Sequence, residues 1–227
     1  MKVSAPHHNK ITHIETQRLI LCLPPPAEAV KVVRYLQKNR EHLANSGPAY
    51  PQDYFNQSFW EERLAQNIAD AHDDKSLRMF MYEKLVRSAD KTFETNESAN
   101  LQPSILHSDI EDELAYDSDI IGGVNLNEIV RRAAQFCYLG YGIDEHHQGC
   151  GLMTEAVQAI VKHAFEEMNI HRIMANYMPI NKRSGALLER LGFTVEGTAC
   201  DYLHINGKWQ DHVLTSLTNP QWKPNLT

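Results

Sequence analysis

Apolar and polar residues repeat with two different periods along the chain, and the switches between them mark out strands and helices. Short apolar or alternating runs bounded by turn residues predict strands at 17–23, 77–85, 120–130, 134–143 and 171–177. Apolar residues spaced three and four apart predict helices at 27–40, from 53 or 58 to 71, at 153–168 and at 181–191. The apolar stripe of the 153–168 helix is typical of a surface that faces a core.

The end of the chain carries the clearest turn signal. Asn206-Gly207 lies between two strand-like runs, residues 194–204 and 209–217. Asn-Gly favours a two-residue hairpin turn because both residues tolerate positive φ. We therefore expect a closing hairpin at this place.

One long segment is markedly acidic. Residues 90–119 carry nine acidic side chains and a single basic one, Lys91. Such a segment cannot bury enough apolar surface to offset the conformational entropy lost on ordering. We interpret it as a long acidic loop, an insertion at about 87–118 in a single domain spanning residues 1–227. A tolerated surface insertion without its own function is the simpler interpretation, and docking of a basic partner is the alternative.

Composition indicates a globular cytoplasmic protein. The 227 residues, 42% apolar and 22% charged, suffice for one substantial core. The four cysteines form no C-x-x-C pair, which is typical of reduced thiols. No run reaches the roughly 18 apolar residues of a membrane span, and the first residues lack the apolar stretch of a secretory signal. The net charge of −7 argues against direct nucleic-acid contact and fits a basic substrate.

A glycine pair marks the place where a strand turns into a helix. Gly149 and Gly151 stand one residue apart between the strand-like run 136–143 and the helix-like run 153–168. Glycine lets backbone N–H groups approach a phosphate closely, and the first turn of a helix adds unpaired donors and a partial positive charge. The segment therefore predicts a polyphosphate ligand.

Two common phosphate loops do not fit this segment. A Walker loop needs Lys and then Ser or Thr after its last glycine, and here Leu152 and Met153 follow Gly151. A dinucleotide fingerprint needs a third glycine near Thr154. The string Q-G-C-G-L instead resembles the pyrophosphate loop of the GNAT superfamily of N-acetyltransferases, which cradles the diphosphate of acetyl-coenzyme A (acetyl-CoA).

The resemblance covers nearly all of the chain except the acidic segment and the first dozen residues. The order strand, Q-G-x-G-L, amphipathic helix, strand, N-x-x-S and L-G-F is that of the superfamily. Several strings are similar to those of the Rim-type ribosomal-protein-alanine N-acetyltransferases. They are T-Q-R-L at 16–19, C-Y-L-G-Y at 137–141, H-R-I-M-A-N-Y-M-P at 171–179, N-K-R-S-G at 181–185, D-Y-L at 201–203 and D-H-V-L at 211–214. The resemblance implies the GNAT fold: an α/β (α+β) domain whose mixed central sheet splays between two strands, with helices on both faces.

For the cofactor, the resemblance implies contacts made largely by the main chain. Amides of residues 148–153 would bind the diphosphate, and the open edge of the 136–143 strand would pair with the pantetheine arm. A backbone N–H near Leu139 or Tyr141 would stabilise the developing oxyanion. No metal is expected. The cofactor-binding residues implied are Leu139, Tyr141, Gln148, Gly149, Cys150, Gly151, Leu152, Met153, Asn176 and Asn181.

For catalysis, the resemblance implies an acid for the departing sulfur and a base for the amine. Leu188 occupies the place where many GNAT enzymes carry a general-acid tyrosine. In Rim-like enzymes the favoured acid is the serine of N-x-x-S, here Ser184. Asp201 and Glu128 are the candidate bases, and Tyr202 is expected to line the acceptor slot.

Plainer interpretations stand beside these roles. Ser184 also fits a helix cap or a solvent-facing position, and Asn181 fits an N-cap that is compatible with a ligand contact. His146 stands where the superfamily loop usually has Arg or Gln; together with His147 it reads as an exposed residue and not as a metal ligand. Cys150 reads as a spacer between the glycines.

The resemblance implies an acetyl-CoA-dependent N-acetyltransferase that acetylates the N-terminal alanine of a ribosomal protein by direct transfer in a ternary complex. Such an enzyme would be a monomer or a weak homodimer in the cytoplasm. Two alternatives remain open at this point. One is an acetyltransferase of a small amine, such as a polyamine or an antibiotic. The other is a non-catalytic acyl-CoA-binding factor that acts in ribosome assembly.

Overall fold

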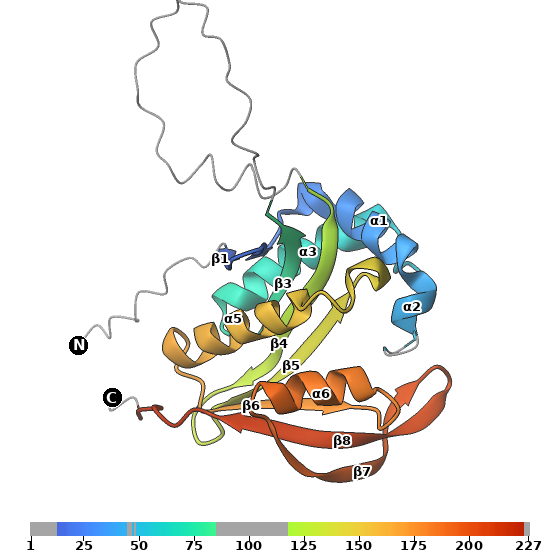
Figure 1. Cartoon of the computed structure of the whole chain (residues 1–227). Coiled ribbons are helices and arrows are strands. Elements are labelled where there is room, and N and C mark those ends of the chain that lie inside the picture. Colours follow the sequence, from blue (N-terminus) through green and yellow to red (C-terminus); the bar gives the residue numbers. More distant parts are fainter. Residues whose placement is uncertain (1–12, 45–46, 48, 85–117, 225–227) are drawn as a thin grey trace, which may run out of the picture.

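The computed structural model describes residues 13–44, 47, 49–84 and 118–224, and it contains an eight-stranded sheet in the order β1-β2-β3-β4-β5-β6-β8-β7 (Figure 1). The predicted acidic insertion lies outside these residues except at its end. The strands are β1 (His13–Glu15), β2 (Leu19–Cys22), β3 (Leu77–Glu83), β4 (Ile120–Val130), β5 (Phe136–Ile143), β6 (Arg172–Tyr177), β7 (Thr194–Ile205) and β8 (Lys208–Thr218). The helices are α1 (Ala29–Lys38), α2 (Arg40–Ala44), α3 (Gln57–His72), α5 (Leu152–Glu166) and α6 (Lys182–Arg190), with 3-10 turns η1 (Pro26–Glu28) and η2 (Glu145–His147).

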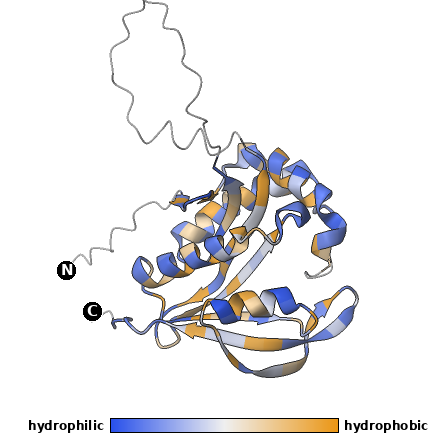
Figure 2. Cartoon of the chain, in the orientation of Figure 1, coloured by the Kyte–Doolittle hydropathy of each residue, from blue (hydrophilic) through white to orange (hydrophobic). Residues whose placement is uncertain are grey.

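Each face of the sheet buries its own core. Successive strand residues point to opposite faces, so in β3 Met79 and Met81 pack in the larger core with α5, whereas Phe80 and Tyr82 pack in the smaller core with α1 and α3. Apolar and polar positions are accordingly interleaved within the strands and helices (Figure 2). Helices thus cover both faces, which confirms the mixed α/β class predicted above.

The sheet opens between β5 and β6. These strands run parallel and pair over residues 136–138 and 172–174, whereas β5 continues to Ile143 and β6 to Tyr177. Strand β5 remains paired with β4 up to its end. Beyond Tyr138, β5 therefore has a free edge on the β6 side (Figure 1). The predicted splay is confirmed.

Most predicted elements are present, and the differences have local causes. The 134–143 strand begins two residues late because Gln135 has a φ of 49°. The predicted helix at 27–40 begins as a 3-10 turn and ends at Lys38; Asn39 is its C-cap, and the unpredicted α2 follows. Strand β1 and helix α2 are too short for either period to reveal them. Asn206 and Gly207 both adopt positive φ, as the predicted hairpin requires. No helix in the described ranges is long and apolar enough to cross a bilayer.

Candidate active site

The loop between β5 and α5 presents backbone N–H groups at the first turn of a helix. Gly149 and Gly151 have φ values of 79° and 81°, a conformation that costs energy for any residue with a Cβ. Gly151 is the N-cap of α5, a helix of 15 residues, so the unpaired donors and the positive end of the helix dipole meet the loop. A Cβ built on Gly149 meets no atom within 4 Å. The loop therefore has the geometry of an open anion site.

An ion pair fastens this loop to the start of the sheet. Arg18 Nε donates to Glu155 Oε2 at 2.7 Å, and the Arg18 backbone N–H donates to Glu155 Oε1 at 2.8 Å. The Thr16 hydroxyl also donates to Glu155 Oε1, at 2.6 Å. Arg18 Nη1 donates to the carbonyl oxygen of Cys150 at 2.9 Å. The Arg18 and Thr16 pair thus fixes both the first turn of α5 and the residue between the two glycines.

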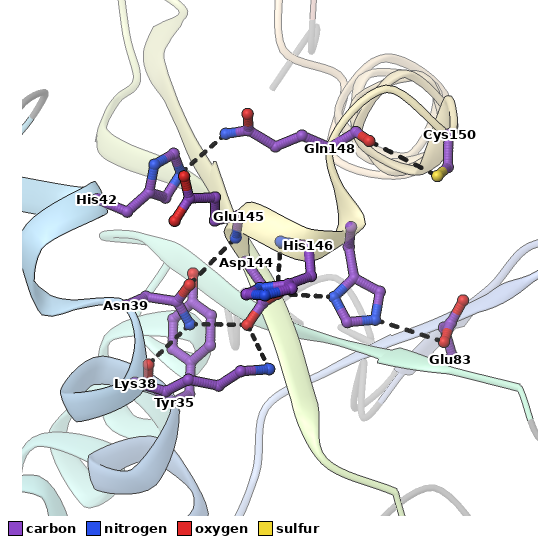
Figure 3. A network of polar contacts seen from close by, with 11 residues as sticks. Tyr35, Lys38, Asn39, His42, Glu83, Asp144, Glu145, His146, Gln148 and Cys150 are labelled. Atoms are coloured by element: carbon purple, nitrogen blue, oxygen red, sulfur yellow. Dashed lines mark hydrogen bonds and ion pairs between the residues drawn. The ribbon is translucent and has the colours of Figure 1, made fainter.

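A buried carboxylate anchors the other end of the loop (Figure 3). Asp144, 1% exposed, accepts hydrogen bonds from Lys38 Nζ at 2.8 Å, Asn39 Nδ2 at 3.0 Å and the His146 backbone N–H at 2.9 Å; His147 Nδ1 lies 3.0 Å away. Burial raises the pKa of this carboxyl, but the hydrogen bonds outweigh burial and hold the pKa well below its usual range. Asn39 Oδ1 also accepts a hydrogen bond from the loop main chain at 3.1 Å. The end of α1 is thereby bonded to the turn that precedes the glycines.

Replacing Asp144 by asparagine is expected to lower the free energy of unfolding by about 1–3 kcal/mol at pH 7, because a buried acceptor of several hydrogen bonds loses its charge. A lowered pKa contributes stability that is present above the unfolded pKa near 4 and is lost as the pH falls through the folded pKa. Urea titrations at pH 7 and at successively lower pH measure this contribution. The gap between wild type and Asp144→Asn should narrow below about pH 4.

The exposed ion pair of Asp73 with Lys75 supplies a matched control for this measurement. Because the Asp73 side chain is 52% exposed and lies away from the loop, Asp73→Asn should leave the unfolding curve unchanged. A destabilisation by Asp144→Asn that stays constant from neutral to acid pH would contradict the role given to its charge.

The side chain of Gln148 joins helices on both sides of the split. Its Nε2 lies 2.8 Å from His42 Nε2 in α2 (Figure 3), and its Oε1 accepts a hydrogen bond from Arg183 in α6. The side chain of Gln148 is therefore engaged within the protein, and its backbone N–H also donates to the Glu145 carbonyl oxygen at 3.3 Å.

Two hydroxyl groups meet where the sheet opens. Tyr141 Oη in β5 and Ser184 Oγ in α6 lie 2.7 Å apart. Asn181 Oδ1 accepts a hydrogen bond from the Ser184 backbone N–H at 3.2 Å, so the N-cap interpretation of Asn181 is confirmed. Leu188, which stands where the resemblance would lead one to expect a general-acid tyrosine, is 1% exposed in the larger core. The second hydroxyl of the site thus comes from the Tyr141 side chain, for which the sequence had indicated only a main-chain role.

The Tyr141 phenol keeps its proton at neutral pH. Burial raises its pKa above the ordinary 10.0, and the hydrogen bond with Ser184 offsets only part of that effect. The Tyr141 and Ser184 pair therefore has two protons that it can donate or share.

A cleft of about 1180 Å³ runs from the glycine loop through the split to the opposite face of the sheet. On the α5 side its wall includes Met153 and Ser184, and on the α1 and α3 side it includes Trp60. On that second face Gly140 and Gly142 line the cleft. Because neither has a side chain, the floor beside the split stays bare.

Basic side chains, four of them arginines, line this cleft. The ionisable lining residues, tyrosines apart, are His42, Arg63, Arg78, His147, Arg183 and Arg190. Within the described residues no Asp or Glu lines it. The whole chain has a net charge of −7, so the positive charge of the cleft wall does not follow from the composition. A wall of this kind favours an anionic occupant.

The structure gathers most of the predicted site residues along the cleft. Those that line it are Tyr141, Gln148, Gly149, Gly151, Leu152, Met153, Asn181 and Ser184. Of the others, Leu139 is buried in the larger core, Cys150 is exposed on the loop, and Asn176 pairs with Leu214 of β8. These three residues do not line the cleft.

The predicted bases and the acceptor-slot tyrosine lie outside the cleft wall. Glu128 and Asp201 are exposed residues with φ values of 50° and 48°. Burial raises the pKa of Tyr138, and its neighbours Tyr202 and Glu128 raise it further. Glu128 and Tyr202 therefore both lie near Tyr138. No group of three or more His, Cys, Asp or Glu side chains that could hold a metal ion occurs in the described part of the chain.

Three residues that organise the site were not identified from the sequence. Arg18 belongs to the string T-Q-R-L, but nothing in the string indicates that it reaches Cys150. Asp144 had one signal, its place between a strand and the glycine loop. Arg183 lies inside the N-x-x-S motif, and its bond to Gln148 depends on how α6 meets the glycine loop.

Comparison with known proteins agrees with this geometry. The Acetyltransferase (GNAT) domain family matches residues 60–194. The chain is 38% identical over 211 residues to the [ribosomal protein uS5]-alanine N-acetyltransferase of Escherichia coli strain K12, covering 93% of each chain. The crystal structure of the ribosomal-protein-S5-alanine acetyltransferase from Vibrio fischeri has a TM-score of 0.76 at 30% identity, covering 93% of this chain and 99% of that one.

A more distant structure shares the fold. Mycobacterium smegmatis RimJ in complex with CoA-disulfide has a TM-score of 0.70 at 21% identity, covering 88% of this chain and 81% of that one. The match to the domain family and the similarity to the Escherichia coli enzyme over 93% of this chain together show the family to which this chain belongs. The chain belongs to the GNAT family of acetyltransferases.

Proposed function

We propose that the chain is an acetyl-CoA-dependent N-acetyltransferase whose acceptor is the N-terminal alanine of a ribosomal protein, and that transfer is direct within a ternary complex. The observation that carries the proposal is the cleft that crosses the sheet at the β5–β6 split. Its two ends open on opposite faces, so an acyl donor and an acceptor can enter from different sides. The relatives named for acetylation of ribosomal proteins support the acceptor class.

The residues of the cleft fit acetyl-CoA at the end beside α5. Open space beside Gly149, the cationic Arg183 and Arg190, and the first turn of α5 suit a diphosphate. The free edge of β5 offers unpaired backbone groups to the amides of a pantetheine arm. When bound, acetyl-CoA supplies an acyl group activated as a thioester. A β5 N–H near Leu139 or Tyr141 would polarise its carbonyl, a contribution typically of about 3 kcal/mol.

The Tyr141 and Ser184 pair is proposed as the acid of the reaction. Ser184 Oγ lines the cleft at the split, 2.7 Å from a phenol that stays protonated. Ser184 donates its proton to the departing sulfur while Tyr141 donates to Ser184, so the pair delivers one proton without leaving a serine alkoxide. Tyr141 is then left as a phenolate, and it regains its proton through solvent from the acetylated amine, which loses one.

Glu128 and Asp201 are the two residues proposed as the general base. An N-terminal amine has a pKa near 8, so a fraction is neutral at physiological pH and modest help suffices. Glu128, in β4, lies near Tyr138, and Tyr138 is in β5 together with Tyr141. Asp201 lies on the edge strand β7. Both candidates lie outside the cleft wall, so either would act through solvent.

The cleft lining weighs against a polyamine as the acceptor. An alkyl polyamine carries several ammonium groups, which only donate hydrogen bonds and need carboxylates or carbonyls around them. The described cleft wall offers arginines and no carboxylate. A peptide amino terminus brings carbonyl oxygens that arginine can bind. The paired hydroxyls at the split favour catalysis over a role as an idle acyl-CoA-binding factor.

The proposal is tested by incubating the purified protein with acetyl-CoA and either a peptide that begins with Ala or spermidine. Mass spectrometry with fragmentation should show one acetyl group on the peptide amino terminus. A peptide with a blocked amino terminus is the matched control and should stay unmodified. Acetylation of spermidine alone would contradict the acceptor assignment, and acetyl-CoA binding without any transfer would contradict the enzymatic role.

A further inference from the structure

An arginine is fixed on the sheet face opposite the glycine loop. Arg78 in β3 points to the same face as Phe80, toward α3. Its Nε donates to Asn127 Oδ1 at 2.9 Å, and its Nη1 lies 3.3 Å from both Asn67 Oδ1 and Asp70 Oδ2. Three side chains therefore hold the guanidinium in one orientation. Its Nη2 forms no hydrogen bond with any described residue and remains available to a ligand in the cleft that Arg78 lines.

The strand register places the backbone of Arg78 two strands away from the split. Arg78 pairs with Asn125 of β4, and Asn125 pairs with Gly140 of β5, the residue next to Tyr141. Two strand spacings amount to about 10 Å. An extended peptide covers about 10 Å with three residues. A chain whose amino terminus reaches the split at Tyr141 and lies along this row would bring its third residue to Arg78.

The chemistry of this end of the cleft selects for hydrogen-bond acceptors. The guanidinium of Arg63 lies over the ring of Phe59, 5.7 Å from its centroid, and Arg63 lines the same end of the cleft as Arg78. Arginine donates and never accepts, so carbonyl and carboxylate oxygens are its partners. A lysine side chain placed there would meet like charge and would lose its solvation. No Asp or Glu lines the described wall, and the Asp70 carboxylate beside Arg78 is already paired with that guanidinium.

We propose that Arg78 is a specificity-determining residue that binds an acidic side chain at or near the third position of the acceptor peptide. This inference rests on the proposed function and adds to it a sequence preference. Acceptors that are acidic near their amino terminus are preferred over basic ones, although the acidic chain as a whole would attract basic partners. The overall charge of −7 therefore does not describe the surface that the acceptor meets.

Two peptides that differ only at the third residue test the inference, Ala-Gly-Glu-Gly-Gly-Tyr and Ala-Gly-Lys-Gly-Gly-Tyr. The wild-type kcat/KM should be about tenfold or more higher for the glutamate peptide, as expected for one charge-assisted hydrogen bond. Arg78→Gln should bring the ratio close to one and leave the KM for acetyl-CoA unchanged. Arg34→Gln is the matched control, since Arg34 is 62% exposed, pairs with Asp119 and lies outside the cleft.

Each outcome of this experiment decides the inference. Equal or better use of the lysine peptide by the wild-type protein overturns the preference and leaves the proposed function standing. Failure to acetylate either peptide overturns both. The comparison of the two peptides with the wild-type protein needs no variant. Arg78→Lys supplies a second variant in case Arg78→Gln fails to fold. Arg78→Lys keeps the charge but loses the planar fork, so its ratio should lie between those of wild type and Arg78→Gln.

Discussion

Valine in place of Gly149 is expected to raise the KM for acetyl-CoA on the order of 100-fold while kcat changes little. The φ of 79° is strained for a β-branched residue, and the added side chain would fill the open space beside the loop. Loss of two backbone hydrogen bonds to a charged phosphate, at about 1.5 kcal/mol each, accounts for a change of this size. Steady-state kinetics with acetyl-CoA as the varied substrate measure it.

Gly207→Val is the control, because it introduces the same backbone strain at a position away from the proposed cofactor site. It has a φ of 74°, and a Cβ built on it also meets nothing within 4 Å, but it lies in the β7–β8 turn, outside the cleft. Gly207→Val should therefore leave the KM for acetyl-CoA unchanged. An unchanged KM in Gly149→Val would contradict the role of the loop in cofactor binding.

Removing the Ser184 hydroxyl is expected to lower kcat by about 100-fold or more, within the range of general acid catalysis, with a small change in either KM. Tyr141→Phe should lower kcat by a smaller factor, because Ser184 remains at the split. The double variant should be no slower than Ser184→Ala, since the two hydroxyls are proposed to act as one unit. Single-turnover rates of acetyl transfer separate this step from product release.

Tyr177→Phe is the matched control for the hydroxyl pair. It removes a phenol near Tyr141 that lies outside the cleft wall. Its kcat should equal that of wild type. Losses that add fully in the double variant would show that Tyr141 and Ser184 act independently, against the proposed relay.

The pH profile gives a separate reading of the same pair. Because burial raises the pKa of Tyr141 above 10.0, its proton is retained throughout the neutral and mildly alkaline range. The kcat of wild type should therefore not decline below about pH 10 through loss of this proton. An alkaline limb at lower pH that disappears in Tyr141→Phe would contradict the raised pKa.

The sequence predicted those parts of the site that depend on local order along the chain. Gly149 and Gly151 between a strand and a helix indicate an anion site because both the left-handed φ values and the helix N-terminus are local features. The N-cap role of Asn181 is local in the same way. The splay of the sheet followed from the family resemblance and is present in the strand register.

What the sequence did not predict depends on contacts between distant segments. Arg18 bonds to Glu155 and the carbonyl of Cys150 across more than a hundred residues, and Asp144 bonds to Lys38 at the end of α1. The paired hydroxyls come from β5 and α6. The charge of the cleft was missed for a related reason: net charge sums over the whole surface, whereas folding selects which side chains line one wall.

The central claim is that backbone amides of the glycine loop bind the diphosphate of coenzyme A, and titration calorimetry tests it most directly. Coenzyme A should bind wild type about 100-fold more tightly than pantetheine, which lacks the diphosphate and the adenosine 3′-phosphate attached to it. Gly149→Val should lose most of that difference, and Gly207→Val should keep it. Equal affinity of wild type for both ligands, or an undiminished difference in Gly149→Val, would contradict the account.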